Sequence, residues 1–259
     1  EFPAQHGAAS QKRIMGQLKA AEREYQDILN RYSKTSLSPL PLATSYVGLG
    51  EVFMDRLEIS PAMKSIQQGL EIAERWGNSD AKIHGYLSMA NLHLAQKKIR
   101  LASPYLEQVD ILLKLRDNRY HKLAQVHATR VQYLLAHSNV QQARQYLDQQ
   151  ELSLHAQVQP HRIVEYLTEV KVLLAEGEIH QARINLDTVA LVYEDTANLR
   201  YLLELRILKS VILSRLGQED EAHQAFSLAL DLAAQEMILR PFVEVGQHLS
   251  DLISLAEKS

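Results

Sequence analysis

The sequence contains no cysteine. This absence excludes a disulfide framework and any reaction that needs a thiolate. Residues that interrupt helices are also few, with 7 prolines and 10 glycines among 259 residues, and aromatic residues make up only 6%. The sequence is instead rich in Ala, Leu, Gln, Glu and Arg, which lose little side-chain freedom in a helix. Helix is therefore the expected secondary structure.

The sequence also lacks a long apolar run, a basic stripe and a secretory signal. No apolar run approaches the roughly 18 residues that suggest a membrane span. The formal net charge is −3 and Lys and Arg are scattered, so we expect no direct contact with nucleic acid. We expect a cytoplasmic protein that does not enter a membrane. Because the sequence starts without Met, we also expect it to be a segment of a longer protein.

A regular repeat runs through the chain. Its marker is an alanine that begins a helix after a short polar break. These alanines are Ala21, Ala62, Ala102, Ala143, Ala182 and Ala222, so the numbering advances by 41, 40, 41, 39 and 40 from one to the next. An apolar or aromatic residue follows each alanine four positions later, which places both on one helix face. The period predicts helix–turn–helix units, each covered by the next.

We therefore predict an all-α fold, a right-handed α-α superhelix (a tetratricopeptide-like solenoid) of about six helix pairs plus a terminal capping helix. The whole of 1–259 is predicted to be one domain with about thirteen helices. The predicted units are 1–40, 41–79, 80–118, 119–159, 160–197 and 198–238, followed by a capping helix at 241–257. In the sixth unit the expected apolar face is Leu205, Leu208 and Ile212.

The residues around the alanines resemble a known repeat. Leu49, Gly50, Phe53, Ala62, Ile66 and Gly69 are similar to a tetratricopeptide (TPR) motif, but the period is near 40 rather than 34. The longer period resembles the repeat (sensor) domain of MalT-like regulators, the large ATP-dependent transcription activators of the LuxR superfamily. Two stretches carry this resemblance: Gly85-Tyr86-Leu87-Ser88-Met89-Ala90, and Arg240-Pro241-Phe242-Val243-Glu244-Val245-Gly246 with Leu249, Leu252 and Ile253 after it.

The resemblance implies a function and several partners. It implies a site for a small-molecule inducer, whose binding promotes oligomerisation of the protein and activation of a promoter. It also implies nucleotide-binding and DNA-binding domains as partners. Neither lies in these residues, since no Gly-x4-Gly-Lys-Ser/Thr loop and no C-terminal helix-turn-helix occur. The identity of the inducer does not carry over from the resemblance.

Polar side chains on the first helix of each unit are the candidates for recognition, because that helix lines the concave surface of a solenoid. Together they could hydrogen-bond a polar small molecule or a peptide; the alternative for each is a solvated helix face. The candidate ligand-binding residues are Glu51, Asp55, His84, Asn91, Gln125, Gln132, Lys171, Glu204 and Arg215. Only two of the nine are basic, so a clamp for an acidic peptide terminus is not expected.

No catalytic residue, metal site or cofactor is predicted. The sequence has 11 histidines, but none form an i, i+4 pair and no His-Glu-x-x-His motif occurs. His93 and His127 fall within the repeat stripes, where a place in the core or the groove is expected. Serines such as Ser60 and Ser79 stand at turns and helix starts, where capping explains them. We therefore do not expect an enzyme.

Aromatic residues recur at equivalent places. One repeat period separates Tyr46 from Tyr86, and two periods separate Tyr86 from Tyr166. We expect all three to fill the wedge between the helices of one unit. A ladder that stacks on a ligand is the alternative. Trp76, the only tryptophan, stands at a helix end, where we expect it to pack against the next unit.

Three functions are compatible with these observations. The first is the sensor domain of a MalT-like transcription activator, favoured by the closing segment from Arg240 to Ile253. The second is a TPR-type protein- or peptide-binding scaffold, which a basic groove would support. The third is a repeat-domain receptor for a signalling peptide.

Overall fold

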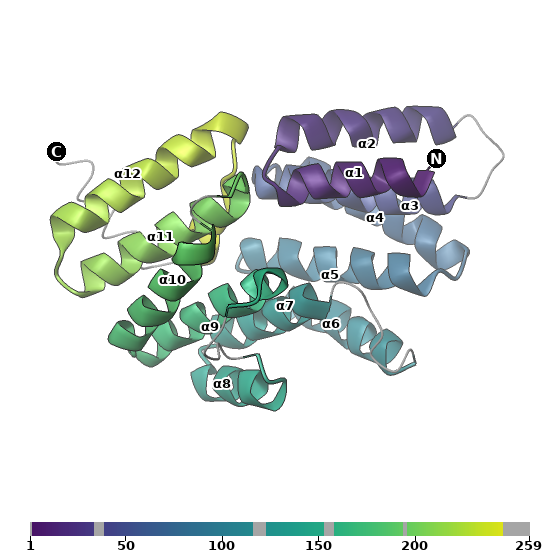
Figure 1. Cartoon of the computed structure of the whole chain (residues 1–259). Helices are drawn as coiled ribbons and strands as arrows, with labels where there is room; N and C mark the ends of the chain where they lie inside the picture. Colours follow the sequence, from purple (N-terminus) through teal and green to yellow (C-terminus); the bar gives the residue numbers. More distant parts are fainter. Residues whose placement is uncertain (1, 34–38, 116–122, 153–157, 194–195, 246–259) are drawn as a thin grey trace. The chain divides into compact units, whose positions relative to one another are not determined.

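The computed structural model describes residues 2–33, 39–115, 123–152, 158–193 and 196–245 (Figure 1). These residues form thirteen α-helices and one short 3₁₀ helix, with no strand among them. The helices are α1 (Phe2–Ile14), α2 (Leu18–Tyr32), α3 (Leu40–Asp55), α4 (Ile59–Arg75), α5 (Ser79–Ala95), α6 (Ile99–Lys114), α7 (Leu123–Ala136), α8 (Val140–Gln149), η1 (Pro160–Arg162), α9 (Ile163–Glu176), α10 (Ile179–Tyr193), α11 (Leu199–Arg215), α12 (Glu219–Glu236) and α13 (Arg240–Val245).

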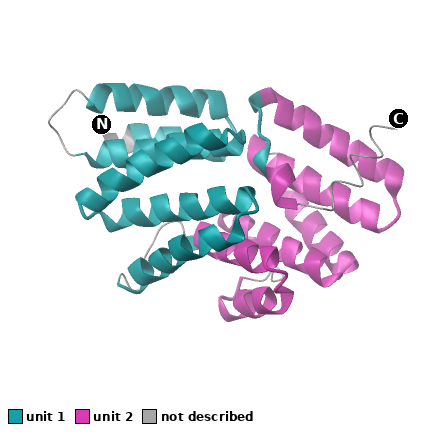
Figure 2. Ribbon diagram, turned by 180° about the vertical axis from the view of Figure 1, so that it is seen from behind, with its two compact units in different colours: residues 1–123, 236–240 teal, residues 124–235, 241–259 magenta. Residues whose placement is uncertain are grey.

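The chain divides into two compact units (Figure 2). Unit 1 consists of residues 1–123 together with 236–240, and unit 2 consists of residues 124–235 together with 241–259. The all-α, TPR-like solenoid predicted from the repeat is confirmed. The continuity of a single stack across both units stays a prediction.

Within each unit, helices that follow one another in the chain pack together. We call the first helix of each predicted pair an A helix and the second a B helix. In unit 1, helices α1 to α6 pack consecutively, and the A helix α3 also contacts the A helices α1 and α5. In unit 2, α9 packs against α10, and α10 against α11, while the A helices α9 and α11 are again in contact. These A helices therefore meet both a B helix and the A helix of a neighbouring pair.

The repeat alanines lie in the core. All six have 0% of their surface exposed. The residue four positions later is buried in every unit, from Tyr25 in the first to Phe226 in the sixth. The residue seven positions after the alanine is buried in every unit except the fourth, where Gln150 is exposed. There α8 ends at Gln149, and Leu152 is the buried residue instead. The sixth-unit face is also confirmed, since Leu205, Leu208 and Ile212 are buried.

Glycines let these helices approach closely in unit 1, as Gly69 and Gly48 show. A Cβ atom on Gly69 of α4 would lie 2.5 Å from the carbonyl oxygen of Ala43 in α3. A Cβ atom on Gly48 of α3 would lie 2.4 Å from the ring of Tyr25 in α2. Both distances are far inside van der Waals contact, so these positions accept no side chain without a shift of their neighbours.

The turn from each A helix to its B helix has the same backbone form throughout. One residue of the turn has a positive φ, and it stands five positions before the repeat alanine. These residues are Gly16, Leu57, Lys97, Ser138, Gly177 and Gly217. In the second unit the Glu58 amide donates to the Phe53 carbonyl at 2.9 Å and the Leu57 amide donates to the Met54 carbonyl at 3.0 Å. This pair of bonds is a Schellman motif, which satisfies carbonyls that the helix end leaves open.

The prediction for Trp76 is wrong. Its side chain is 66% exposed, and it lines a small cavity with Leu40 and Ile72 of its own helix pair. The buried face of α4 includes Ala73, and the residue four positions later on the same face is Gly77. Trp76 precedes Gly77 by one residue, so its indole lies to the side of the buried face.

Other expectations fall partly outside the described residues. Of the predicted capping helix at 241–257, the structure describes only the part up to Val245, within α13. The predicted boundary between the units 80–118 and 119–159 also lies outside the described residues. No described helix is both long enough and apolar enough to cross a membrane.

Candidate functional site

Inner positions of neighbouring A helices pair with each other in both units. Glu51 of α3 and His84 of α5 approach with their Oε1 and Nε2 atoms 3.0 Å apart. Lys171 of α9 and Glu204 of α11, at the same spacing in sequence, have their Nζ and Oε1 atoms 2.6 Å apart. Glu51 and Lys171 stand eleven positions before their repeat alanines, and His84 and Glu204 eighteen. The same geometry thus holds two different pairs of residues.

The larger network lies in unit 1 and links α1, α3 and α5. Arg13 of α1 contacts two carboxylates of α3, with 3.0 Å to Glu51 Oε2 and 3.2 Å to Asp55 Oδ2. The hydroxyl of Ser88, one turn after His84 in α5, donates to Glu51 Oε1 at 2.9 Å. The Asp55 side chain is 0% exposed. Two buried carboxylates are therefore held by a guanidinium, a hydroxyl and an imidazole, as buried charges require.

Arg240 adds a second guanidinium to this network. Its Nη1 atom lies 3.5 Å from Asp55 Oδ1, and it belongs to unit 1 together with α1 and α3. Asp55 thus faces Arg13 through one oxygen and Arg240 through the other. Two arginines and two carboxylates, those of Glu51 and Asp55, thus meet in this network.

The second network lies in unit 2 on successive A helices. Lys171 of α9 contacts Glu204 of α11 and also Glu244 of α13, whose Oε2 atom lies 3.7 Å from its Nζ. All three side chains are partly buried. Glu244 was not among the predicted ligand-binding residues. The signal was present, because Glu244 follows Glu204 by one repeat period and so occupies the equivalent place.

The structure thus brings together five of the nine predicted ligand-binding residues, in two separate groups. Glu51, Asp55 and His84 share one network, and Lys171 and Glu204 share the other. Each of these side chains is engaged within the protein. Arg13 and Ser88 were missed, because only a few positions of each A helix were considered.

The other four predicted residues lie elsewhere on the A helices. Asn91 is half-buried in α5, and Gln125 and Gln132 are half-buried in α7. Arg215, at the end of α11, donates from Nη1 to the carbonyl of Leu174 in α9 at 2.6 Å. Burial lowers the pKa of this guanidinium. Both basic candidates, Lys171 and Arg215, therefore already have acceptors inside unit 2.

The recurring tyrosines do not form a uniform set. Tyr166 is buried, and its hydroxyl accepts a hydrogen bond from the Gln159 amide at 3.1 Å. Tyr46 and Tyr86 are half-buried, and the Tyr86 hydroxyl donates to Glu74 Oε1 of α4 at 2.8 Å. Burial, followed by this hydrogen bond, raises the pKa of Tyr86 to about 12. Equivalent tyrosines in the sequence thus have different surroundings.

Two histidines predicted in the core or groove make aromatic contacts. The ring of His93 in α5 is stacked on Tyr105 of α6, with centroids 5.6 Å apart. His127 of α7 pairs with Tyr146 of α8, and its Nδ1 atom lies 2.7 Å from the tyrosine hydroxyl. Burial lowers the pKa of both histidines. Both rings lie between the helices of a pair.

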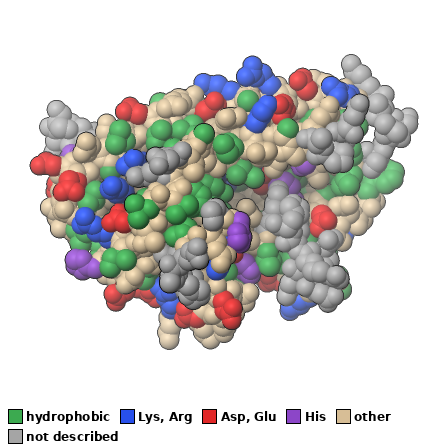
Figure 3. Space-filling view, in the orientation of Figure 1, with side chains coloured by type: hydrophobic (Ala, Val, Ile, Leu, Met, Phe, Trp, Pro, Cys, Tyr) green, Lys and Arg blue, Asp and Glu red, His purple; other side chains and the backbone are tan. Residues whose placement is uncertain are grey.

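The described residues show no ready-made metal centre. In ranges 2–33, 39–115, 123–152, 158–193 and 196–245, no three His, Asp or Glu side chains group closely enough to hold a metal ion. Figure 3 shows acidic and basic side chains in small groups on this face, with hydrophobic side chains between them. The polar networks on the A helices are therefore the strongest candidate site.

The repeat architecture has a counterpart among known families. A family model described as "MalT-like TPR region" matches residues 4–259, which is nearly the whole chain. No curated protein matches the chain.

Proposed function

The chain belongs to the MalT-like TPR family, and from this premise we propose that it is the effector-sensing and oligomerisation domain of a bacterial transcription activator. In this proposal the A helices bind a small-molecule inducer inside the superhelix. Binding then favours a homo-oligomer. The nucleotide-binding and DNA-binding domains of the longer protein respond to this change in oligomeric state. The chain carries out no chemical step of its own.

The observation that carries the proposal is the match over residues 4–259. The polar networks support it, because their side chains stand on successive A helices and are held by partners of known geometry. Polar groups that are already fixed lose little conformational freedom when they bind a ligand. A ligand with several hydroxyl or amide groups fits such a surface better than an apolar one.

The alternative is a TPR-type protein- or peptide-binding scaffold. A scaffold for acidic peptide ends needs basic side chains free to clamp a carboxylate. Lys171 is instead paired with Glu204 and Glu244, and Arg215 donates to Leu174. A peptide carboxylate would have to replace these partners, so the sensor is the better supported function.

Thermal unfolding of the protein with candidate ligands tests the proposal. Sugars, metabolites and aromatic acids are compared with short peptides. We expect one class of small molecule to raise Tm in a saturable way. Replacement of a half-buried inner amide, Gln132→Ala, should reduce that rise, whereas Gln142→Ala on the exposed side of α8 should leave it intact. Sedimentation velocity with the same molecule should show a larger species.

Two outcomes would count against the proposal. Stabilisation by peptides alone would favour the scaffold. A small molecule that raises Tm without changing the sedimentation coefficient would support sensing but remove oligomerisation from the function of this region.

A further inference from the structure

Residues 236–240 form a short segment, here called the strap, that belongs to unit 1. The residues before it, up to Gln235, and those after it, from Pro241, belong to unit 2 (Figure 2). The strap starts with the last residue of α12 and ends with the first residue of α13. Met237 within it has φ 60, so the chain leaves the helix direction there.

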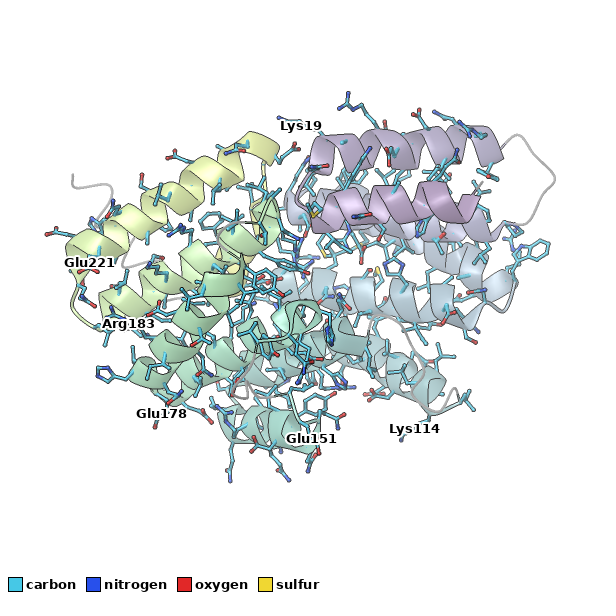
Figure 4. The ribbon with its side chains drawn as sticks, viewed as in Figure 1. Lys19, Lys114, Glu151, Glu178, Arg183 and Glu221 are labelled. Carbon is cyan, nitrogen blue, oxygen red and sulfur yellow. The ribbon has the colours of Figure 1, made fainter. Side chains whose placement is uncertain are left out.

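The first strap contact is at the start of α2. The Glu236 carboxylate accepts a hydrogen bond from the backbone amide of Lys19 at 2.8 Å, although 217 residues separate them. Lys19 is the second residue of α2 and is labelled in Figure 4. Gln17, which precedes α2, makes no capping hydrogen bond with its side chain. A carboxylate is the group that a helix N-terminus favours, so Glu236 supplies a cap from far along the chain.

The second strap contact is at the end of α3. The Leu239 amide donates to the carbonyl oxygen of Asp55, the last residue of α3, at 2.8 Å. The last carbonyls of a helix have no partner inside that helix, so the strap satisfies one of them. Ile238, between the two polar contacts, is completely buried. The strap therefore completes the ends of two helices.

The third strap contact is electrostatic. Arg240 Nη1 lies 3.5 Å from Oδ1 of Asp55, whose other oxygen faces Arg13. Loss of Arg240 would remove a positive charge from beside the buried Asp55 carboxylate. A buried charge that loses a partner is strongly destabilised. The network therefore favours the docked strap specifically through the charge of Arg240.

The strap buries one apolar side chain completely. Ile238 is its one buried residue, while Met237 is 53% exposed and Leu239 is 37% exposed. Segments with few buried apolar contacts open at a lower free-energy cost than the core around them. The docked state of the strap thus combines the burial of Ile238 with hydrogen bonds and charge.

We propose that the strap is a charge-dependent latch, which docks on the ends of α2 and α3 through Glu236 and Arg240 and opens as a unit without unfolding α1 to α5. Opening removes the Glu236 carboxylate from the start of α2 and the Arg240 guanidinium from Asp55. This inference is independent of the proposed inducer.

Amide hydrogen exchange on the whole protein tests the latch. The Leu239 and Lys19 amides, which donate to Asp55 and Glu236, should be protected together. Arg240→Met keeps an apolar stem without the charge, and it should raise both exchange rates at least about tenfold. The exchange rate of Val52, within α3, should not change. Arg240→Lys should restore part of the protection.

Arg183→Met is the matched control, because Arg183 lies on α10 and hydrogen-bonds Gln218 in unit 2. It should leave the Leu239 and Lys19 amides unchanged. Leu239 exchange at the rate of an unfolded chain in the parent protein would overturn the proposal. An Arg240→Met variant with unchanged Leu239 exchange would also overturn it. Equal acceleration of Leu239 and Val52 would show that the strap is part of the core, which overturns separate opening.

Discussion

Arg144 and Glu176 join the fourth and fifth helix pairs through two parallel hydrogen bonds. Arg144 Nε donates to Glu176 Oε1 at 2.9 Å, and Nη2 donates to Oε2 at 2.6 Å. The bonds to Glu176 raise the pKa of Arg144, so the guanidinium stays charged. In unit 1, Arg56 and Glu22 make the reverse pairing at 2.6 Å and at equivalent repeat positions. The fold therefore accepts either orientation of the charge pair at this junction.

Reversing the pair tests this equivalence. We expect Arg144→Glu and Glu176→Arg each to destabilise the protein alone, because each places like charges together. The double variant should recover most of the loss. A double-mutant cycle from urea unfolding should give a coupling of about 1 kcal/mol or more, because the pair is bidentate and partly buried. The more exposed pair Arg183 and Asp187 is the control, with an expected coupling below about 0.5 kcal/mol. Equal couplings for both pairs would contradict the prediction.

The A-to-B turns predict mutations that stabilise the protein. Lys97 and Ser138 adopt φ 58, a conformation that costs a residue with a Cβ about 1–2 kcal/mol. Both side chains are exposed, so Lys97→Gly or Ser138→Gly removes strain without loss of packing. We expect each to raise the free energy of unfolding by about 1 kcal/mol.

Gly177→Ala is the reverse experiment at the same turn position. A Cβ there would meet no atom within 4 Å, so only the backbone conformation, φ 84, opposes alanine. A loss of about 1 kcal/mol in urea unfolding is expected. A stabilising Gly177→Ala, or a destabilising Lys97→Gly, would show that turn strain does not limit stability.

Close packing between α3 and α4 predicts a large effect from one methyl group. Gly69→Ala would place its Cβ 2.5 Å from a backbone oxygen and 2.7 Å from Val47 Cγ2. Backbone cannot rotate away as a side chain can, so we expect a loss of about 3 kcal/mol in the free energy of unfolding. Gly7→Ala in α1 has no atom within 4 Å of the added Cβ. This control should gain up to about 1 kcal/mol from helix propensity, and a loss like that of Gly69→Ala would contradict the argument.

Stability should fall in mildly acidic solution, partly because of His93. Burial, and then Lys98, lowers the pKa of this imidazole. The unfolded state then takes up a proton near pH 6.5, while the folded state resists it. The contribution of neutral His93 to the free energy of unfolding is therefore fully present above about pH 6.5 and is lost as the pH falls. His93→Phe keeps a ring against Tyr105 and should lose less stability than the parent between about pH 7.5 and 5.5 in urea unfolding. An identical pH dependence in both proteins would exclude His93 as a contributor.

Much of the fold could be predicted because one small residue defines each unit. The repeat alanines must be small for helices to meet, and this requirement leaves a regular trace in the sequence. The turns are marked less clearly in the sequence. Glycine marks the positive-φ position at Gly16, Gly177 and Gly217, but Leu57 and Lys97 adopt it too, because the Schellman hydrogen bonds outweigh the strain.

The polar candidates could be located in the sequence, but their pairings could not. Glu51 and His84 were selected as ligand-binding residues, and nothing in the sequence shows that their atoms lie 3.0 Å apart. Arg240 was noted only as part of the closing segment. Its contact with Asp55 spans 185 residues, and periodicity describes neighbouring units rather than distant ones. The prediction for Trp76 was wrong for a different reason, because a side chain at a helix end can point away from the core.

The distance in sequence between Asp55 and Arg240 also matters while the protein is being made. A ribosome adds about 5–20 residues per second, so Arg240 is synthesised roughly 10–40 seconds after Asp55. Helices form in microseconds or less, and α1, α2 and α3 are thus able to pack long before the strap exists. During that interval the start of α2 lacks the Glu236 carboxylate and Asp55 lacks Arg240. The emerging chain therefore passes through a stage in which α1, α2 and α3 are fully synthesised but the charged groups of Glu236 and Arg240 that contact them are still absent.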